Sequence, residues 1–216
     1  MVSSARLSEP SHCEQWMKKP GAIKTHLPTQ LVKYSTEAKY IAVVCNPRDV
    51  INGIFEDTFE NLMSGYANSG NYFTFYKDWY ERSRNPNVLF VVYEDLKRNP
   101  EDVILKIARF MGEKYEANLL KDDRKRLGDV VKYTSVDEMN FEFQGPEFEG
   151  FRQFHRGIHS GGEDAANSIN YVRKRIVGDW KNHFSQKHLK RLNAKFRRKT
   201  EGNDIANLWP DMNFLH

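Results

Sequence analysis

A histidine and a lysine in the segment Gly21–Pro28 could take part in group transfer. A histidine side chain ordinarily titrates near neutral pH, so the neutral imidazole of His26 could accept a proton from a hydroxyl nucleophile. Lys24 lies two residues earlier and, in an extended segment, points to the same side, where its ammonium could stabilise growing negative charge. A structural or incidental pair is the alternative. The segment therefore offers a candidate base and a candidate electrostatic partner.

A run of cations, Arg173, Lys174 and Arg175, could capture phosphate. Three consecutive residues cannot all share one face of a helix or strand, so at least one of these cations must turn away. The alternative interpretation is a basic turn that is exposed to solvent and binds no ligand. Arginine offers bidentate geometry to phosphate, and lysine a point charge. The surrounding stretch 151–200 holds 13 Lys/Arg against 3 Asp/Glu, although the whole chain has a net charge of only +4. This asymmetry predicts an anionic partner on one face: nucleic acid, anionic lipid or a small phosphorylated ligand.

Two runs rich in β-branched residues, Lys39–Cys45 and Asn87–Tyr93, have the pattern of strands buried on both faces. Helical spacing fills the chain between them, first over Val50–Tyr66 and then over Tyr72–Arg84. A further helix is predicted from Asn99-Pro100 to Gly112. Strands joined through helices need a crossover connection, so the fold class is α/β, with a parallel sheet flanked by helices.

The ends of the two strands are the first place to look for a ligand. In an open parallel sheet, ligands bind beyond the carboxyl ends of the strands. The first strand ends at Cys45 and is followed by Asn46-Pro47, a signature of a helix start, whose free N–H groups favour anions. Tyr93 closes the second strand at the same edge. An ordinary capped helix without a ligand is the alternative.

The 216 residues predict a single domain, with residues 1–20 poorly defined and residues 140–170 forming a lid loop. A further helix is predicted to begin at Ser185, with its cations mostly solvated. Hydrophobic residues make up 39%, too many for a disordered chain. No apolar run approaches 18 residues, so no membrane span is expected. Two cysteines cannot form a disulfide framework, and with no leader pattern in the sequence a cytoplasmic location is expected.

At this point Lys24–Pro28 (KTHLP) resembles a signature of the cytosolic sulfotransferases, and further blocks follow in the order of that family. These blocks are Gly70–Trp79, Asn85–Lys97, Thr134–Met139 and Arg173–Lys181. The resemblance implies a P-loop-like sulfotransferase fold and transfer of a sulfuryl group from 3′-phosphoadenosine 5′-phosphosulfate (PAPS). The acceptor would be a hydroxyl or amine of a small molecule, and the product nucleotide 3′-phosphoadenosine 5′-phosphate (PAP). No metal, nucleic-acid or membrane partner is implied.

The resemblance also implies roles for single residues. His26 would be the general base and Lys24 would help to hold the transferring group, with Lys24, Thr25 and His26 next to the acceptor. The nucleotide-binding residues would surround the adenine (Tyr93, Thr134, Ser135, Met139) and contact the 3′-phosphate (Tyr171, Val172, Arg173, Lys174, Arg175). This gives the basic run a ligand of the right sign.

The sequence departs from the family pattern at functional positions. The family's phosphosulfate loop, a TYPKSGTTW-like strand–loop–helix, is absent from the 216 residues. Cys45 stands where an arginine is expected to bind the 3′-phosphate, Gly53 where a serine is expected, and Arg175 where a glycine is expected. The family's dimer motif is degraded, so a family-type homodimer is not expected; its positions are Lys181, Ser185, Gln186 and Lys190. We therefore expect a truncated sulfotransferase that is weak or inactive as given, with one strand left at an unpaired edge. The alternative is a non-catalytic binding or scaffold protein of the same fold.

Overall fold

The computed structural model describes residues 21–25, 27, 29–50, 55–65, 71–142, 145, 148–149 and 177–209. In chain order the elements are η1 (Thr29–Leu31), β1 (Tyr40–Val44), α2 (Phe55–Ser64), α3 (Tyr72–Arg82), β2 (Val88–Val92), α4 (Tyr93–Arg98), α5 (Pro100–Met111), α6 (Glu113–Leu119), α7 (Lys125–Tyr133), α8 (Val136–Glu142), η4 (Asp179–Asn182), α10 (Gln186–Lys199) and η5 (Ile205–Leu208).

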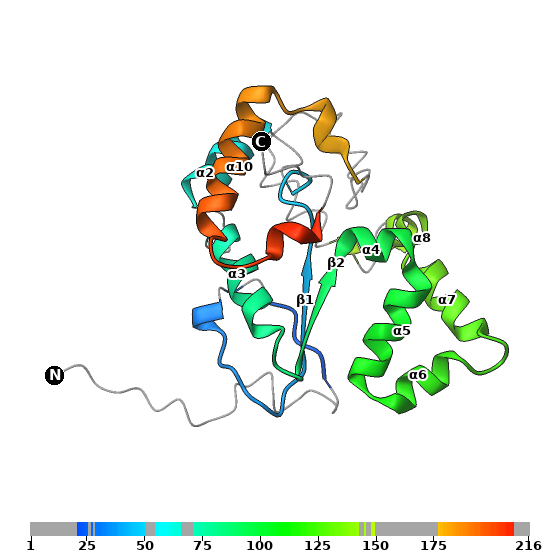
Figure 1. The fold of residues 1–216 in the computed structure, drawn as a ribbon. Helices are drawn as coiled ribbons and strands as arrows, with labels where there is room; N and C mark the ends of the chain where they lie inside the picture. The colour runs from blue at the N-terminus through cyan, green and yellow to red at the C-terminus, as the bar shows by residue number, and fades with distance from the viewer. Residues whose placement is uncertain are drawn as a thin grey trace.

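The sheet lies between two groups of helices (Figure 1). Its two strands are parallel, with Tyr40 opposite Val88 and Val44 opposite Val92. In the view of Figure 1, helices α2, α3 and α10 lie on one side of the strands, and α5, α6 and α7 lie on the other. The predicted α/β fold with a parallel sheet is confirmed.

Local signals placed the boundaries of the longer helices. Asn71 caps α3 by accepting hydrogen bonds from the backbone N–H groups of Phe73 and Thr74. Helix α5 starts with Pro100 in its first turn and ends at Gly112, as predicted. The predicted lid boundary is wrong at one end, because residues 140–142 are the last residues of α8. The rest of the predicted lid lies almost entirely outside the described residues.

Strand β1 is not buried on both faces, so that prediction is wrong. Ala42 and Val44 are buried, whereas Ile41 is 39% exposed and Val43 is 52% exposed. Alternate residues of a strand point to opposite faces, and only the face of Ala42 and Val44 joins the buried core clusters. Within the described part of the chain, β1 pairs with β2 alone, which leaves its other edge open.

Val43→Thr is expected to reduce aggregation without lowering stability. An open strand edge with exposed apolar side chains promotes association between chains, and threonine keeps the β-branched shape while adding a polar group. Light scattering during heating and the soluble fraction after expression measure the effect. The matched control is Ala42→Thr on the buried face, which should lower the unfolding midpoint because the hydroxyl is buried there. Equal effects of the two variants would contradict the alternating burial.

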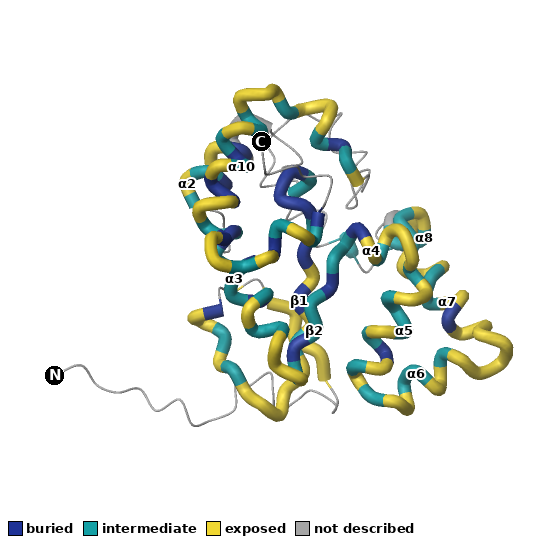
Figure 2. Tube along the Cα trace, viewed as in Figure 1, coloured by how far each residue is buried: buried dark blue, intermediate teal, exposed yellow. Residues whose placement is uncertain are grey.

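The core on the buried face of β1 joins helices that are distant from one another in the sequence (Figure 2). Phe59 from α2, Phe73 from α3 and Phe196 from α10 are fully buried in one cluster with Val44. On α10, Leu192 and Phe196 are spaced by four residues and face inward, as an amphipathic helix requires. The long apolar side chains of this cluster therefore hold the three helices against the sheet.

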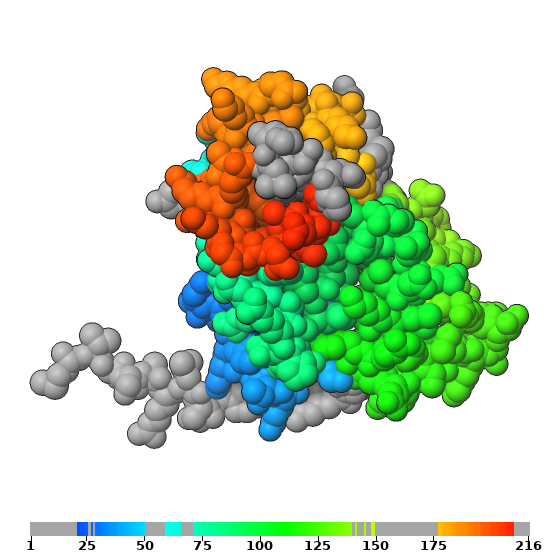
Figure 3. All heavy atoms as spheres, in the orientation of Figure 1, coloured from blue at the N-terminus to red at the C-terminus, as the bar shows by residue number. Residues whose placement is uncertain are grey.

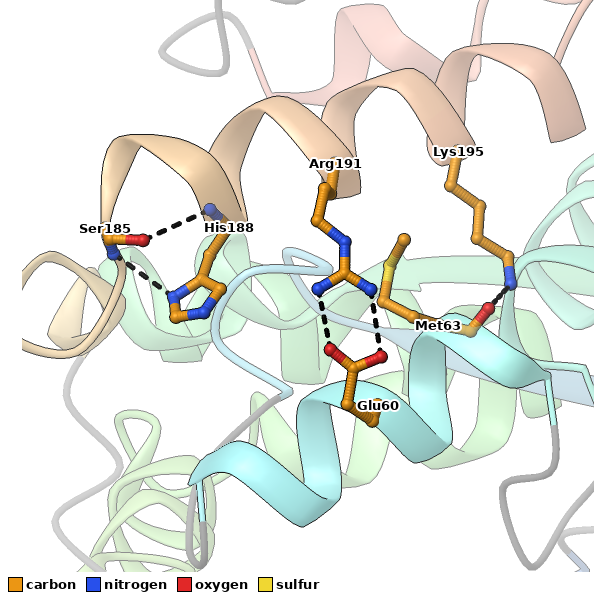
Figure 4. Close-up of polar contacts among 6 residues, drawn as sticks. All are labelled: Glu60, Met63, Ser185, His188, Arg191 and Lys195. Atoms are coloured by element: carbon orange, nitrogen blue, oxygen red, sulfur yellow. Dashed lines mark hydrogen bonds and ion pairs between the residues drawn. The ribbon is translucent and has the colours of Figure 1, made fainter.

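Polar contacts clamp α10 onto α2 (Figure 4). The guanidinium of Arg191 donates to both carboxylate oxygens of Glu60, at 2.6 and 2.9 Å. Lys195 is buried and donates to the carbonyl oxygen of Met63 near the C-terminal end of α2, where a cation is favoured. The cations of this helix were predicted to be mostly solvated; the Arg191 side chain keeps 39% exposure, but its pairing with Glu60, 131 positions away in the sequence, was not predicted.

Ser185→Ala is expected to lower the free energy of unfolding by about 1 kcal/mol. The Ser185 hydroxyl accepts a hydrogen bond from the His188 backbone N–H, and the His188 imidazole accepts one from the Ser185 backbone N–H, which completes a capping box. Urea unfolding measures the loss. The control, Ser185→Asp, restores a capping oxygen and should recover most of the stability. No difference between the two variants would show that the cap contributes little.

Candidate functional site

The carboxyl end of β1 is surrounded by tyrosines from α3. The backbone N–H of Cys45 donates to the hydroxyl oxygen of Tyr76 at 3.0 Å. The hydroxyls of Tyr72 and Tyr76 both donate to the carbonyl oxygen of Cys45, the former at 3.3 Å. Tyr72 and Tyr76 are four residues apart on α3, so they share one face of the helix. This helix face thus positions the residue at which the strand ends.

The thiol of Cys45 is an unreactive group in this environment. Burial, and then the nearby charge of Glu94, raises the pKa of Cys45 to about 12. Burial also raises the pKa of Tyr76 well above its usual value. Because the thiolate is the nucleophilic form of cysteine, Cys45 is neutral and inert near pH 7. It cannot supply the positive charge that an arginine would bring to a phosphate.

After Cys45 the chain makes a hydrogen-bonded turn. The Asn46 carbonyl accepts from the Asp49 backbone N–H at 2.8 Å, and the Asn46 side-chain oxygen accepts from the Arg48 backbone N–H at 2.9 Å. The predicted helix start at Asn46-Pro47 is therefore a turn through Val50, and α2 is described only from Phe55 onward. Residues 51–54, which include Gly53, lie outside the described residues. The asparagine side chain fixes the turn because it bonds to the backbone two residues on.

A buried carboxylate joins this turn to two other segments. Glu94 follows β2 and accepts from the Asn46 backbone N–H at 2.7 Å and from the Trp209 indole N–H at 3.0 Å. Glu94 is 8% exposed and Trp209 is 4% exposed. A buried charge needs such partners, because an unpartnered one loses its solvation. Glu94 therefore ties the ends of both strands to the C-terminal part of the described chain.

Asp49 ties the same turn to η4. Its carboxylate accepts from the backbone N–H of Gly178 at 2.8 Å and from that of Trp180 at 3.3 Å. The guanidinium of Arg48 lies 4.7 Å from the ring centroid of Trp180 and donates to the side-chain oxygen of Asn193 at 3.1 Å. Burial raises the pKa of Asp49 despite the two N–H donors. The segment that follows the basic run 171–175 is thus held at the carboxyl end of β1.

The structure describes only part of the predicted catalytic segment. His26 lies outside the described residues, whereas Lys24 and Thr25 are exposed. The segment continues into η1, where the Thr29 hydroxyl donates to the carboxylate of Asp78 on α3. At the other end of α3, the Tyr72 hydroxyl bonds to Cys45. Because a helix rises about 1.5 Å per residue, the contacts of Asp78 and Tyr72 lie roughly 9 Å apart along α3. Helix α3 therefore supports both the predicted acceptor segment and the predicted nucleotide end of the sheet.

The predicted adenine-binding residues lie on separate helices. Tyr93 is the half-buried first residue of α4, which directly follows β2. Thr134 is exposed at the end of α7, where its hydroxyl donates to the Val130 carbonyl at 2.7 Å. Ser135 and Met139 are half-buried in the junction of α7 with α8 and in α8. Residues 171–175, predicted to contact the 3′-phosphate, lie outside the described residues.

Three further observations concern metal binding, membrane spans and a pocket outside the site. Among the described residues, no group of three or more His, Cys, Asp or Glu side chains could hold a metal ion. Nor does any described helix have the length and apolarity needed to cross a bilayer. A surface pocket of about 380 Å³ lies between η1 and the C-terminal half of α3, away from Cys45; it is lined by Thr29, Gln30, Asp78, Glu81, Arg82 and Asn85.

Sequence reasoning did not single out the residues that assemble the turn. Asp49, Glu94 and Trp209 act through partners 48 to 131 positions away in the sequence. Glu94 and Trp180 fall inside the blocks that carried the resemblance, so their position was a usable signal. No pattern in the sequence pointed to Trp209.

Comparison with known proteins shows the family of this chain. The family model of the sulfotransferase domain matches residues 8–204. Human Sulfotransferase 1C2 is 30% identical over 94% of this chain and 70% of its own length, and bovine Sulfotransferase 1E1 is 27% identical over 88% of this chain and 65% of its own length. The chain therefore belongs to the sulfotransferase family and spans about two thirds of these relatives.

Solved structures share the fold. A crystal structure of mouse sulfotransferase SULT7A1 complexed with PAP matches 92% of this chain and 72% of its own, with a TM-score of 0.68 and 22% identity. Retinol dehydratase, in a complex with androsterone and PAP, matches 89% of this chain and 57% of its own, with a TM-score of 0.68 and 21% identity. At these identities the likeness concerns the fold alone.

Proposed function

We propose that this chain carries the acceptor side and part of the nucleotide side of a PAPS-dependent sulfotransferase that acts on a hydroxyl or amine of a small molecule. The observation that carries the proposal is the pair of hydrogen bonds from Gly178 and Trp180 to Asp49. These bonds tie the chain after the basic run 171–175 to the turn that follows Cys45. An anionic nucleotide would lie next to this junction, at the carboxyl ends of the strands.

In this proposal His26 accepts the proton of the acceptor hydroxyl as the acceptor oxygen attacks sulfur. The bond between sulfur and the bridging phosphate oxygen breaks in line, and PAP leaves with that electron pair. Lys24 stabilises the charge on the transferring group, with Thr25 beside the acceptor. Such transfers depend mainly on positioning and on charge stabilisation. The proposed nucleotide contacts are Tyr93, Thr134, Ser135 and Met139 for the adenine, and Tyr171, Val172, Arg173, Lys174 and Arg175 for the 3′-phosphate.

We further propose that transfer by the 216 residues alone is weak or absent. They contain no Lys-Ser/Thr phosphosulfate loop, and Cys45 is neutral. The neutral thiol at this position also favours a second candidate function, a non-catalytic binding or scaffold protein that keeps the fold. In both cases we place the protein in the cytoplasm and propose no family-type homodimer.

Calorimetry with PAP tests the proposal. We expect the chain to bind PAP with a dissociation constant weaker than about 1 µM, because Arg173 and Lys174 are present but other expected phosphate ligands are not. The double variant Arg173→Ala/Lys174→Ala should abolish the heat of binding. The control removes two exposed cations elsewhere, in Lys121→Ala/Lys125→Ala, and should bind as the parent does. No binding at millimolar PAP would reject the nucleotide site and favour the second candidate, and equal losses in both variants would show nonspecific attraction.

A further inference from the structure

The C-terminal segment Asp204–Trp209, here called the strap, crosses the helices beside the sheet. Figure 3 shows it in red beneath α10 and over α3. Ile205 is fully buried, and the Tyr80 hydroxyl of α3 donates to the carboxylate of Asp204 at 3.0 Å. The strap ends at Trp209, five residues beyond the region that the sulfotransferase family model matches. Apart from Asp204, the strap therefore lies beyond the part of the chain that the family model matches.

Trp209 makes two kinds of contact. Its ring packs against Tyr76, with centroids 5.8 Å apart, and against Phe196, with centroids 6.3 Å apart. Its indole N–H donates to Glu94 at 3.0 Å. The first kind of contact contributes to the core, and phenylalanine can keep most of it. The ring reaches Cys45 only through Tyr76, whereas the indole N–H bonds directly to Glu94, the partner of the Asn46 N–H, and this bond is lost with the nitrogen.

The Glu94 carboxylate divides its oxygens between two segments. One oxygen accepts from the Asn46 backbone N–H at 2.7 Å, and the other accepts from Trp209. A buried carboxylate that loses one donor is destabilised and reorients toward other donors or water. The Asn46 N–H would then lose its fixed partner, and the start of the turn would depend on its own hydrogen bonds and on the contacts of Asp49 with η4.

We propose that Trp209 is a positioning residue: by holding Glu94 it fixes the Cys45–Asp49 turn on which the nucleotide would dock. The contacts of Glu94 with Trp209 and with the Asn46 N–H, here called the clamp, are observed within the chain. Only the identity of the docked ligand rests on the proposed function. Cys45 reports on the clamp because it adjoins Asn46 and its side chain lies 4.0 Å from the Tyr72 hydroxyl in the closed turn.

The test is the rate at which iodoacetamide alkylates Cys45 in the native full chain, followed by peptide mass spectrometry so that Cys13 is scored separately. Trp209→Phe should raise the rate at Cys45 by at least tenfold. The matched control is Ile205→Val in the same strap, which shortens a buried side chain without touching Glu94. It should change the rate less than threefold. A rate within twofold of the parent for Trp209→Phe, or an equal rise for Ile205→Val, would overturn the proposal.

Glu94→Gln gives a second route if Trp209→Phe folds poorly. It should also raise the rate at Cys45, and the double variant should react no faster than the faster single variant, because both act through one contact. If the two substitutions instead multiplied each other's effect on the alkylation rate of Cys45, the clamp would be rejected. PAP calorimetry on the same proteins separates the two proposals: weaker binding in Trp209→Phe than in Ile205→Val supports both. A faster Cys45 reaction in a chain that never binds PAP supports the clamp and rejects the nucleotide.

Discussion

Replacing His26 with alanine is expected to slow sulfuryl transfer by about 10²- to 10⁴-fold in a chain that carries a phosphosulfate loop, the range that a positioned general base contributes. The acceptor hydroxyl is a weak nucleophile until its proton is removed. An alanine cannot take that proton, so the attacking oxygen would become positively charged as the bond to sulfur forms. Loss of the base therefore lowers the rate of the chemical step and leaves nucleotide binding nearly unchanged.

The experiment compares transfer rates in a chimera in which a TYPKSGTTW-like strand–loop–helix, the phosphosulfate segment expected from the family resemblance, precedes this chain. Gln30→Ala controls for disturbance of the same segment, because Gln30 is exposed in η1 and its side-chain amide donates to the carboxylate of Asp78 at 2.8 Å. It should keep the parental rate. Full activity in His26→Ala would reject its role as the base. Robust turnover by the 216 residues without the added segment would reject the proposal that they are weak or inactive alone.

Cys45→Arg is expected to tighten PAP binding by about 10- to 150-fold, since a hydrogen bond to a charged group contributes about 1.5–3 kcal/mol. The site offers a compensating environment for the new charge. Glu94 and Asp49 both raise the pKa of Cys45, which shows that a positive group at this position would be attracted to their carboxylates. A guanidinium could therefore be held here and present further donors to a phosphate.

Calorimetry of Cys45→Arg against the parent measures the gain. Thr36→Arg is the matched control, because Thr36 is exposed and precedes β1 at the opposite end of the strand. It adds the same charge far from the proposed nucleotide and should leave the affinity unchanged. An equal gain in both variants would indicate general attraction of the anion. No gain in Cys45→Arg would show that residue 45 does not face the nucleotide.

The strands and most helix boundaries could be predicted because their signals are local. The β-branched runs gave β1 and β2, and the order of elements gave their parallel pairing. Pro100 and Ser185 marked predicted helix starts, and the cap at Asn71, which was not predicted, likewise bonds within one turn of the backbone. Asn46-Pro47 failed as a helix start, since the same asparagine side chain also stabilises a turn.

The candidate site could be predicted only in outline. The position of Cys45 at the end of a parallel strand followed from the pattern of elements. The surroundings of Cys45 did not, because its tyrosines, Glu94 and the Asp49–Gly178 contact come from segments brought together by folding. Arg191 looked solvated in the sequence for the same reason: nothing local reveals that Glu60 lies opposite.

The sequence by itself determined the family and the parallel α/β class, and it predicted which residues carry the chemistry, because motif spacing, hydrophobic period and capping signals each lie within a few residues of one another. Tertiary structure alone decided which face of β1 is covered, which buried charges have partners and what holds the turn after Cys45. Those outcomes depend on packing between segments up to 131 positions apart, where burial changes the cost of each charge and raises the pKa of Asp49.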